Sequence, residues 1–379
     1  MIKNSMAFIL AITVLLCGDF TTSVSAKPGK DLRIIPVIVN GQKVRFPDTE
    51  PYINTDGRTM VPVRFVSEKL GAKVDWEPAT ETAVIRYGEK EIKMPVGSTT
   101  VAVNGESVEL DTAAEKFEGR TMVPLRFVSE VMESKVDWDE GAHAVKVTDA
   151  KYQAKVDAGE VKLDPWGREY SKKQDEYWMR LTDLETTGFY NVHYKSSNRK
   201  FFETRLYDDL GKTYVDEWAT HIRDYYAAQL NVDYRTIDAE KFAKTLIANM
   251  RGMSTYDRQG FYEWFLYYVE WVKKNKIIAK GYADPENSQV MGGSSETAEM
   301  RVYFKFMIIS GEDTSQTFLD NWQVSRTSDS FKLKKGVWYG GYASVVLNTN
   351  IINARFSGFA VDHYENMFGK MSYQYKVLN

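Results

Sequence analysis

The sequence predicts an α+β fold in two parts: duplicated small units of β-sheet and helix at the N-terminal end, then helices packed on an antiparallel sheet. Three observations carry this prediction. One segment occurs twice before residue 150, apolar residues recur at helical spacing between residues 214 and 272, and they alternate with other residues after residue 300.

The duplication is visible in two long motifs. The run GRTMVPVRFVSE begins at Gly57 and GRTMVPLRFVSE begins at Gly119, and KVDW follows from Lys73 and again from Lys135. Fifteen of 20 positions match at a spacing of 62. Because Val-Asn-Gly also precedes both copies, the repeat covers a whole supersecondary unit.

Each copy has local signals for a hairpin and a helix. Asn40-Gly41 separates two short apolar runs, which is the common two-residue hairpin turn. Val66 and Leu70 stand four residues apart, and Gly71 follows as a helix stop. Short strands are expected to return afterwards, so each repeat is predicted to be a small antiparallel sheet on one helix.

These motifs resemble the copper amine oxidase N-terminal-like (stalk) domain of exported proteins from Gram-positive bacteria. The resemblance covers residues 36–149, in two repeats at about 36–88 and 99–149. In that family the domain is a stalk or surface-attachment element outside the catalytic part of the oxidase. The resemblance therefore implies a non-catalytic module.

Amine oxidase activity itself is excluded by composition. Copper sites of that oxidase need clustered imidazoles, but the four histidines are far apart, at His143, His193, His221 and His363. The T-x-x-N-Y segment of the quinone cofactor is missing too. We predict no catalytic, cofactor-binding or metal-binding residues, and no cofactor.

The first 26 residues have the pattern of a secretory signal peptide. Lys3 gives a basic start, residues 7–16 are apolar, and cleavage is expected after Ala26. Residues 27–35 then form an N-terminal extension. The only cysteine, Cys17, lies inside the signal, so the mature chain has no thiol. The predicted location is secreted or cell surface, with no membrane span in the mature chain.

The net charge of −3 disfavours nucleic acid as a partner, because no basic tract is present to release counterions from phosphates. The partners that remain are cell-wall polymer or another surface protein.

A composition shift marks a second domain. Seven of nine Trp and 21 of 23 Tyr follow residue 150. Residues 150–165 break the apolar periodicity and are predicted to be a linker or extended connector. Residues 166–379 are predicted to form an α+β domain of unknown function.

Three helices are expected first in this domain. Trp218 and Ile222 belong to an apolar stripe, and Asp238 is the expected N-cap of the second helix. The third, at about 257–275, is apolar nearly all round, which predicts the most buried helix.

A loop rich in Gly, Ser and Asn is expected at residues 284–295, followed by a half-buried strand over residues 301–308. Further strand candidates, separated by Gly or Asn turns, are residues 318–324, 332–339, 342–347, 353–360 and 372–377.

Four residue pairs recur in both repeats: Gly57 and Gly119, Arg58 and Arg120, Asp75 and Asp137, Trp76 and Trp138. They could form a binding surface, but holding a small fold together explains repetition equally well. In that structural interpretation the Gly supplies a turn, the Trp closes the core and the Arg caps the Asp of its own repeat.

Other candidate chemistry is incomplete. The candidates were the small-residue turn Gly292-Gly293-Ser294-Ser295, Glu217 with His221, the acid pairs Asp183/Glu185, Asp208-Asp209 and Asp216-Glu217, and an aromatic sugar platform at Trp322, Trp338 and Tyr339. None completes a nucleophile–base pair, a zinc site or a glycosidase motif.

Three functions stay open. The first is a non-catalytic exported surface-attachment or binding protein, whose stalk-like module presents the C-terminal domain at the cell envelope. The second is an extracellular hydrolase of wall or polymer glycan, and the third is a small-molecule-binding pocket protein in which Tyr and Trp line a pocket of the C-terminal domain.

Overall fold

The computed structural model describes residues 34–170, 181, 183, 211–250, 254–292, 297–314, 333–348, 360–361 and 373–378. We call residues 34–149 the N-terminal module and the described residues from 166 onward the C-terminal domain. The expected signal peptide lies outside the described residues.

The elements of the N-terminal module follow the duplicated sequence. The first repeat contains β1 (Val37–Val39), β2 (Gln42–Lys43), β3 (Tyr52–Ile53), β4 (Thr59–Pro62), α1 (Val63–Lys69), β5 (Lys73–Glu77) and β6 (Thr82–Tyr87). The strand β7 (Lys90–Pro95) joins the repeats. The second contains β8 (Thr100–Val103), β9 (Glu106–Glu109), β10 (Glu115–Phe117), β11 (Arg120–Pro124), α2 (Leu125–Val131), β12 (Ser134–Asp139) and β13 (Ala144–Asp149).

The predicted hairpin turns are confirmed. Asn40 and Gly41 have φ of 47° and 75°, and Asn104 and Gly105 have φ of 51° and 84°. Such left-handed pairs match the twist of the strands on either side. Helix α1 also ends where the sequence indicated, with Gly71 at φ 89°.

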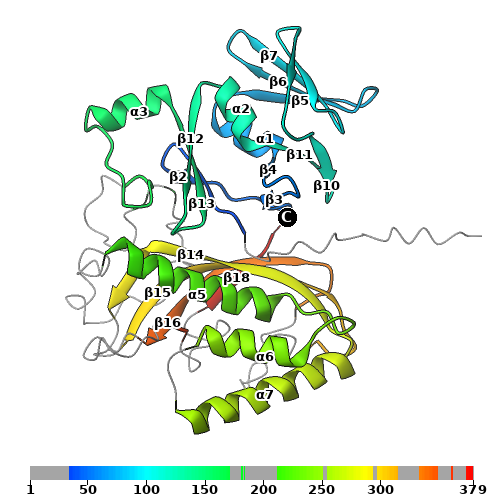
Figure 1. Ribbon diagram of the computed structural model, residues 1–379, viewed down its shortest axis with the longest axis vertical. Helices are drawn as coiled ribbons and strands as arrows, with labels where there is room; N and C mark the ends of the chain where they lie inside the picture. Colours follow the sequence, from blue (N-terminus) through cyan, green and yellow to red (C-terminus); the bar gives the residue numbers. More distant parts are fainter. Residues whose placement is uncertain are drawn as a thin grey trace, which may run out of the picture. The chain divides into compact units, whose positions relative to one another are not determined.

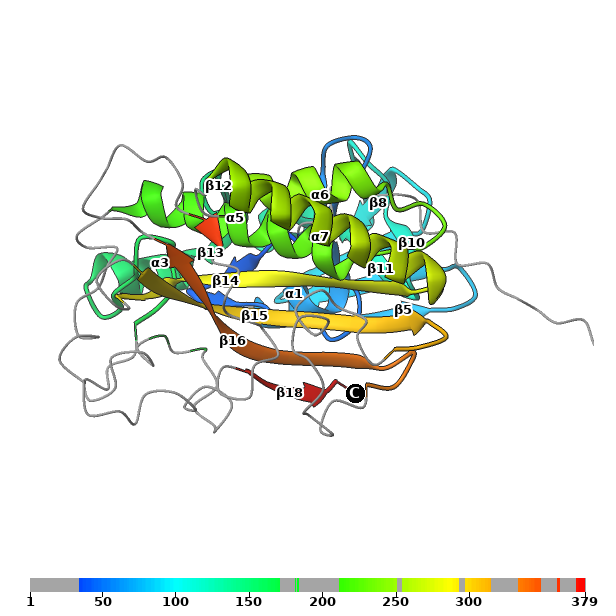
Figure 2. The ribbon, with the colours of Figure 1, turned by 90° about the horizontal axis from the view of Figure 1, so that it is seen from below.

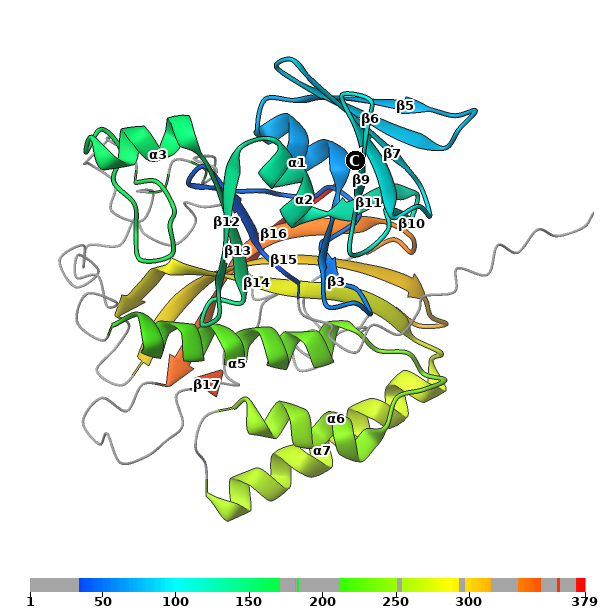
Figure 3. The ribbon, with the colours of Figure 1, turned by 45° about the horizontal axis from the view of Figure 1, so that its top comes forward.

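The predicted units of small sheets and helices are confirmed, but the strands are not divided into one sheet for each repeat, because the repeats exchange strands. The first-repeat hairpin β1–β2 joins β12 and β13 of the second repeat, and the second-repeat hairpin β8–β9 continues the sheet of β5, β6 and β7. A third sheet, ordered β10-β11-β4-β3, takes two strands from each repeat. Helices α1 and α2 lie between these sheets (Figure 3). Both repeats therefore share one apolar core.

The segment predicted to be an extended connector begins with a helix, α3 (Ala150–Asp157). Asp149 caps it, since the carboxylate accepts a hydrogen bond from the backbone N–H of Tyr152 at 2.7 Å. The chain then returns to the first hairpin, where Glu169 N–H donates to the carbonyl of Gly41 at 2.8 Å.

The C-terminal domain is α+β, as predicted. Its helices α5 (Lys212–Leu230), α6 (Ala239–Ala248) and α7 (Thr255–Lys274) precede a long antiparallel sheet. That sheet contains β14 (Ile278–Gly292), β15 (Thr297–Ser310), β16 (Trp338–Asn348), β17 (Ala360–Val361) and β18 (Tyr373–Val377). Helices and sheet share the second apolar core, and Figure 2 shows β14, β15 and β16 side by side.

The most buried helix is α5 rather than the predicted α7. Eleven residues of α5 are buried, against four of α7. Tyr267 of α7 is 67% exposed. The aromatic run of α7 is apolar in composition, but only one stripe of it faces the core, whereas α5 packs directly on β14.

Two turn predictions in the sheet are also wrong. Residues 284–292 belong to strand β14 instead of a loop, and Gly340-Gly341 continues strand β16 instead of separating two strands. Residues 318–324 lie outside the described residues, as does most of 353–360.

Strand β15 is buried on both faces in its middle, not half-buried. Phe304 and Phe306 face the helical core, while Lys305 on the opposite face is also fully buried. The covering layer on that second face is the N-terminal module, which Figure 1 shows across the sheet from α5, α6 and α7.

Candidate binding pocket and the domain interface

An interdomain ion network joins the two parts of the chain. It consists of Lys43, Arg45, Arg168, Asp183, Asp284 and Glu286. Lys43 Nζ lies 3.0 Å from Asp284 Oδ1 and 3.2 Å from Glu286 Oε2. Arg45 pairs with the same two carboxylates, and Arg168 pairs with Glu286.

The network is desolvated and electrically balanced. The side chain of Glu286 is fully buried and that of Lys43 is 6% exposed. Burial alone would raise the pKa of Glu286, but the charges of Arg168 and Lys43 hold it well below its ordinary value. Burial also lowers the pKa of Lys43 against the pull of its acidic partners. Three cations face three carboxylates, so the network is a docking contact and not an acid–base pair.

A second contact lies beside the network. Lys305 Nζ is 2.7 Å from Glu50 Oε1 and donates to the Phe46 carbonyl at 3.0 Å. The Tyr282 hydroxyl donates to Glu50 at 2.9 Å. Burial raises the pKa of Glu50 despite the nearby Lys305.

The N-terminal residues of the ion network, Lys43 and Arg45, belong to the first repeat. The second repeat contacts the C-terminal domain elsewhere, where Glu118 pairs with Lys280 at 3.0 Å and Asp139 with Lys212 at 2.8 Å. When the Asn-Gly turns are aligned, Lys43 corresponds to Ser107 and Arg45 to Glu109. Ser107 and Glu109 are exposed on the free hairpin of the second repeat. The duplicated units have therefore diverged at the two positions that join the ion network in the first repeat.

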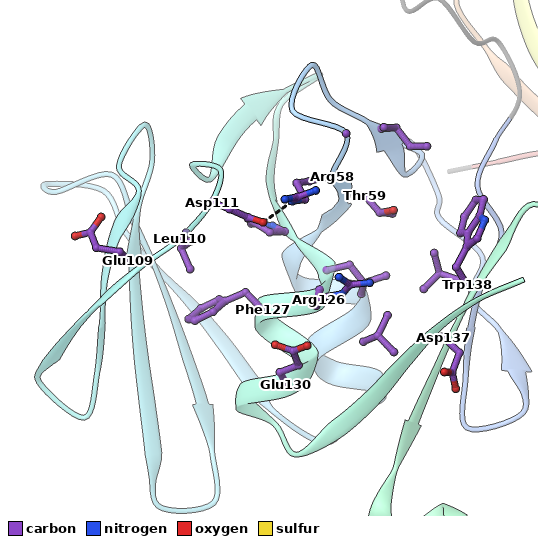
Figure 4. Close-up of a pocket in the computed structure, with 16 residues that line it drawn as sticks. Arg58, Thr59, Glu109, Leu110, Asp111, Arg126, Phe127, Glu130, Asp137 and Trp138 are labelled. Carbon is purple, nitrogen blue, oxygen red and sulfur yellow. Dashed lines mark hydrogen bonds and ion pairs between the residues drawn. The ribbon is translucent and has the colours of Figure 1, made fainter. Parts of the chain in front are cut away.

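The corresponding side of the second repeat is open and contains a pocket of about 520 Å³ (Figure 4). Its walls come from the β3–β4 turn, the end of β9, the start of α2 and strand β12. The charged and aromatic side chains around it are Arg58, Glu109, Asp111, Arg126, Phe127, Glu130, Asp137 and Trp138.

The pocket has a simple origin in the sequence. In the first repeat Phe46 packs edge to face on Phe65, with 5.9 Å between ring centroids. The second repeat has Leu110 and Phe127 at these positions, and both line the pocket. A leucine is smaller than a phenylalanine ring, so this difference between the repeats favours open space beside Phe127.

Four of the eight recurring residues line this pocket, and the other four do not. Gly57, Arg58, Asp137 and Trp138 line the pocket, and Figure 4 labels the last three. These four residues therefore share one surface, and whether that surface binds a ligand is taken up as a proposal below.

The structural roles assigned to the recurring residues need correction. Arg58 pairs with Asp111 and Arg120 with Asp48, so each arginine binds an aspartate of the other repeat. Trp138 does not close the core, because it is 39% exposed.

The histidine candidates form no metal site among the described residues. His221 Nδ1 lies 2.9 Å from Asn249 Oδ1, which makes it a hydrogen-bonded packing residue. His143 contacts the edge of Trp138 at 5.0 Å between centroids. His193 and His363 lie outside the described residues.

The acid pairs do not form a paired-carboxylate site in the described part of the chain. Asp183 belongs to the ion network. Asp216 is buried and accepts hydrogen bonds from Trp166 Nε1 at 2.6 Å and Asn287 Nδ2 at 2.8 Å. Asp208, Asp209, Glu185 and the Gly293-Ser294-Ser295 turn lie outside the described residues.

The two described residues of the proposed aromatic platform, Trp338 and Tyr339, do not form an open surface. Tyr339 is buried and stacks on Phe306. The ring of Trp338 has Lys280 and Lys305 each 4.9 Å from its centroid. Trp322 lies outside the described residues.

Sequence reasoning missed Leu110, Arg126 and Phe127 as pocket residues. The available signal was a difference between the repeats, Phe46 against Leu110, rather than an identity. Comparing the repeats for mismatches would have located the open side.

Residues 38–147 match the family model described as the copper amine oxidase N-terminal domain. A protein of Brevibacillus choshinensis described as a protease inhibitor is 28% identical over 144 residues. That alignment spans 38% of this chain and 42% of the relative, so the chain covers less than half of that protein. No solved structure matches the chain. Within the described residues, no helix has the length and apolar composition needed to cross a membrane.

Proposed function

We propose, on the premise that residues 38–147 are a copper amine oxidase N-terminal domain, that this chain is a non-catalytic exported binding protein of the cell envelope. In this proposal the first repeat supplies the buried ion network to the C-terminal domain, and the pocket beside the second repeat engages an envelope component.

The observation that supports this proposal is the asymmetry of the duplicated module. The first repeat uses Lys43, Arg45 and Glu50 to dock on the C-terminal sheet. The second repeat leaves the corresponding hairpin exposed and has a pocket where the first is filled. The first repeat thus supplies the buried ion network, and the pocket side of the second repeat is available for a ligand.

The hydrolase alternative has less support. Asp284 and Glu286 lie close together, but Lys43, Arg45 and Arg168 neutralise them and burial removes them from substrate. A catalytic acid needs access to the scissile bond and a pKa near the working pH.

The test is co-sedimentation of the mature protein, residues 27–379, with isolated Gram-positive cell walls. Retention of the protein in the wall pellet is expected, and an Arg126→Glu and Trp138→Ala double variant should stay in the supernatant. The Lys116→Ala variant is the control, since Lys116 lies outside the pocket and pairs with the exposed Glu81. Absence of wall retention, or equal retention of the double variant, contradicts the proposal.

A second function, binding of a protease, is favoured by the description of the Brevibacillus choshinensis relative. Residual activity of serine proteases and metalloproteases incubated with the mature protein tests it. Stoichiometric loss of activity is the expected result, and full activity with an excess of the protein contradicts it.

A further inference from the structure

We propose that the second-repeat pocket binds an uncharged pyranose chain, with the rings of Trp138 and Phe127 as stacking surfaces. The proposal rests on the proposed function and specifies its ligand. It is argued from the aromatic groups, the charges and the size of the pocket.

Trp138 is held in place although it is 39% exposed. Its indole Nε1–H donates to Glu140 Oε2 at 2.5 Å, and His143 contacts the ring at 76° between planes. An exposed aromatic ring with fixed orientation loses little side-chain entropy when a ligand stacks on it. The flat face suits the C–H face of a sugar ring better than an irregular apolar group.

A second aromatic ring lies across the pocket. Figure 4 shows Phe127 and Trp138 on opposite sides of Arg126, with Arg58 beside Asp111. The pocket therefore combines aromatic rings with hydrogen-bonding groups. This combination matches a chain of sugars, which presents both apolar ring faces and hydroxyls.

The charges select against ionic ligands. Four carboxylates and two guanidinium groups surround the pocket: Glu109, Asp111, Glu130 and Asp137 against Arg58 and Arg126. The acidic excess repels phosphate-rich polymers. A basic peptide would be repelled by the guanidinium group of Arg126, which lies between the two rings. Hydroxyl groups can donate to the carboxylates and accept from the arginines, so a neutral sugar satisfies both sets.

The volume is compatible with such a ligand. About 520 Å³ lies within the range of roughly 300–1,000 Å³ that small-ligand sites have. The first repeat cannot offer the same space, because Phe46 is buried against Phe65 there.

The test uses isothermal titration calorimetry of the mature protein with chitotetraose and cellotetraose as neutral probes. Oligogalacturonate and tetralysine serve as anionic and cationic comparators. At least one neutral tetrasaccharide is expected to bind, and both charged probes should bind at least tenfold more weakly. Tighter binding of either charged probe, or no binding of either neutral one, overturns the proposal.

Two variants assign the binding to the pocket. Trp138→Ala should weaken it about tenfold or more, equivalent to about 1.4 kcal/mol. Leu110→Phe should block sugar binding, because it places in the second repeat the phenylalanine that the first repeat has at Phe46. Trp76→Phe, at the matching position of the first repeat, is the control and should bind normally. Thermal melting of each variant separates a lost ligand contact from a lost fold.

The two proposals fail in distinguishable ways. Wall retention that depends on Trp138, without any binding of neutral sugar, would uphold the envelope function and overturn the ligand assignment. Sugar binding without wall retention would uphold the ligand assignment and overturn the envelope function. Sugar binding that Leu110→Phe leaves intact in a folded protein would also overturn the assignment, because the ligand would then lie elsewhere.

Discussion

Val61 of the first repeat lies directly opposite Val123 of the second, its own counterpart in the duplication, in the antiparallel pair β4–β11. On either side Met60 faces Pro124 and Pro62 faces Met122. The repeats are therefore related by a local two-fold axis through this pair, in the manner of an isologous dimer fused into one chain. The reciprocal pairs Arg58–Asp111 and Arg120–Asp48 follow the same symmetry.

The exchange of hairpins predicts that neither repeat folds alone. Residues 34–98 lack β12 and β13, the partners of the first hairpin, and residues 99–149 lack β7, the partner of the second. Each isolated fragment should give the circular dichroism spectrum of an unfolded chain, and residues 34–149 should give a folded one. A cooperative melt of either fragment would contradict the shared core.

The interdomain ion network predicts a large cost for removing one charge. Glu286→Gln leaves Lys43, Arg45 and Arg168 in excess in a buried site, which should lower the free energy of unfolding by about 3 kcal/mol. Urea denaturation measures the change. Glu81→Gln is the matched control, since its pair with Lys116 is exposed and should change stability by less than about 1 kcal/mol. Equal effects would mean that the network is solvated.

The same carboxylate predicts a pH dependence. The pKa of Glu286 is depressed in the folded state, so its stabilisation is complete above the unfolded value of about 4.3 and is lost as pH falls below it. The difference in stability between wild type and Glu286→Gln should be full at pH 7 and shrink below about pH 4. Glu50 acts in the opposite direction because burial raises its pKa. Urea titrations of wild type and Glu286→Gln at several pH values therefore test the difference in stability between the two proteins and not the total stability of either. With unfolding reversible at each pH, a constant difference down to pH 3 would contradict the assignment.

The two hairpin glycines predict unequal costs for the same mutation. A Cβ at Gly41 would lie 2.9 Å from Glu169 Cβ and 3.1 Å from Glu169 N, whereas nothing lies within 4 Å of one at Gly105. Both positions have positive φ, so both Gly→Ala variants carry backbone strain of roughly 1 kcal/mol. Gly41→Ala should be more destabilising by at least a further 1 kcal/mol or so, since residues packed on the turn must move. Thermal melts of the two variants, compared directly, check this; equal melting temperatures would show that the segment around Glu169 yields freely.

Local features of the fold were predictable from sequence because neighbouring residues determine them. Asn40-Gly41 dictates a hairpin through its positive φ angles, and Asp238 caps α6 through a hydrogen bond to Lys241 N–H at 2.8 Å. The continuous strand through Gly340-Gly341 was missed, because pairing with β15 and β18 overrides the turn preference of two glycines.

The amino-acid sequence by itself determined the duplication, the hairpins, the short helices and the α+β class, since periodicity and turn chemistry act within a few residues. Only the tertiary structure decided that the repeats exchange strands, that Lys43 and Arg45 dock on the C-terminal sheet, and that Leu110 leaves a pocket beside Phe127. Strand pairing, burial of charge and open volume depend on which distant residues meet. Two repeats that share 15 of 20 residues in their longest motif thus acquire different surroundings through the positions at which they differ.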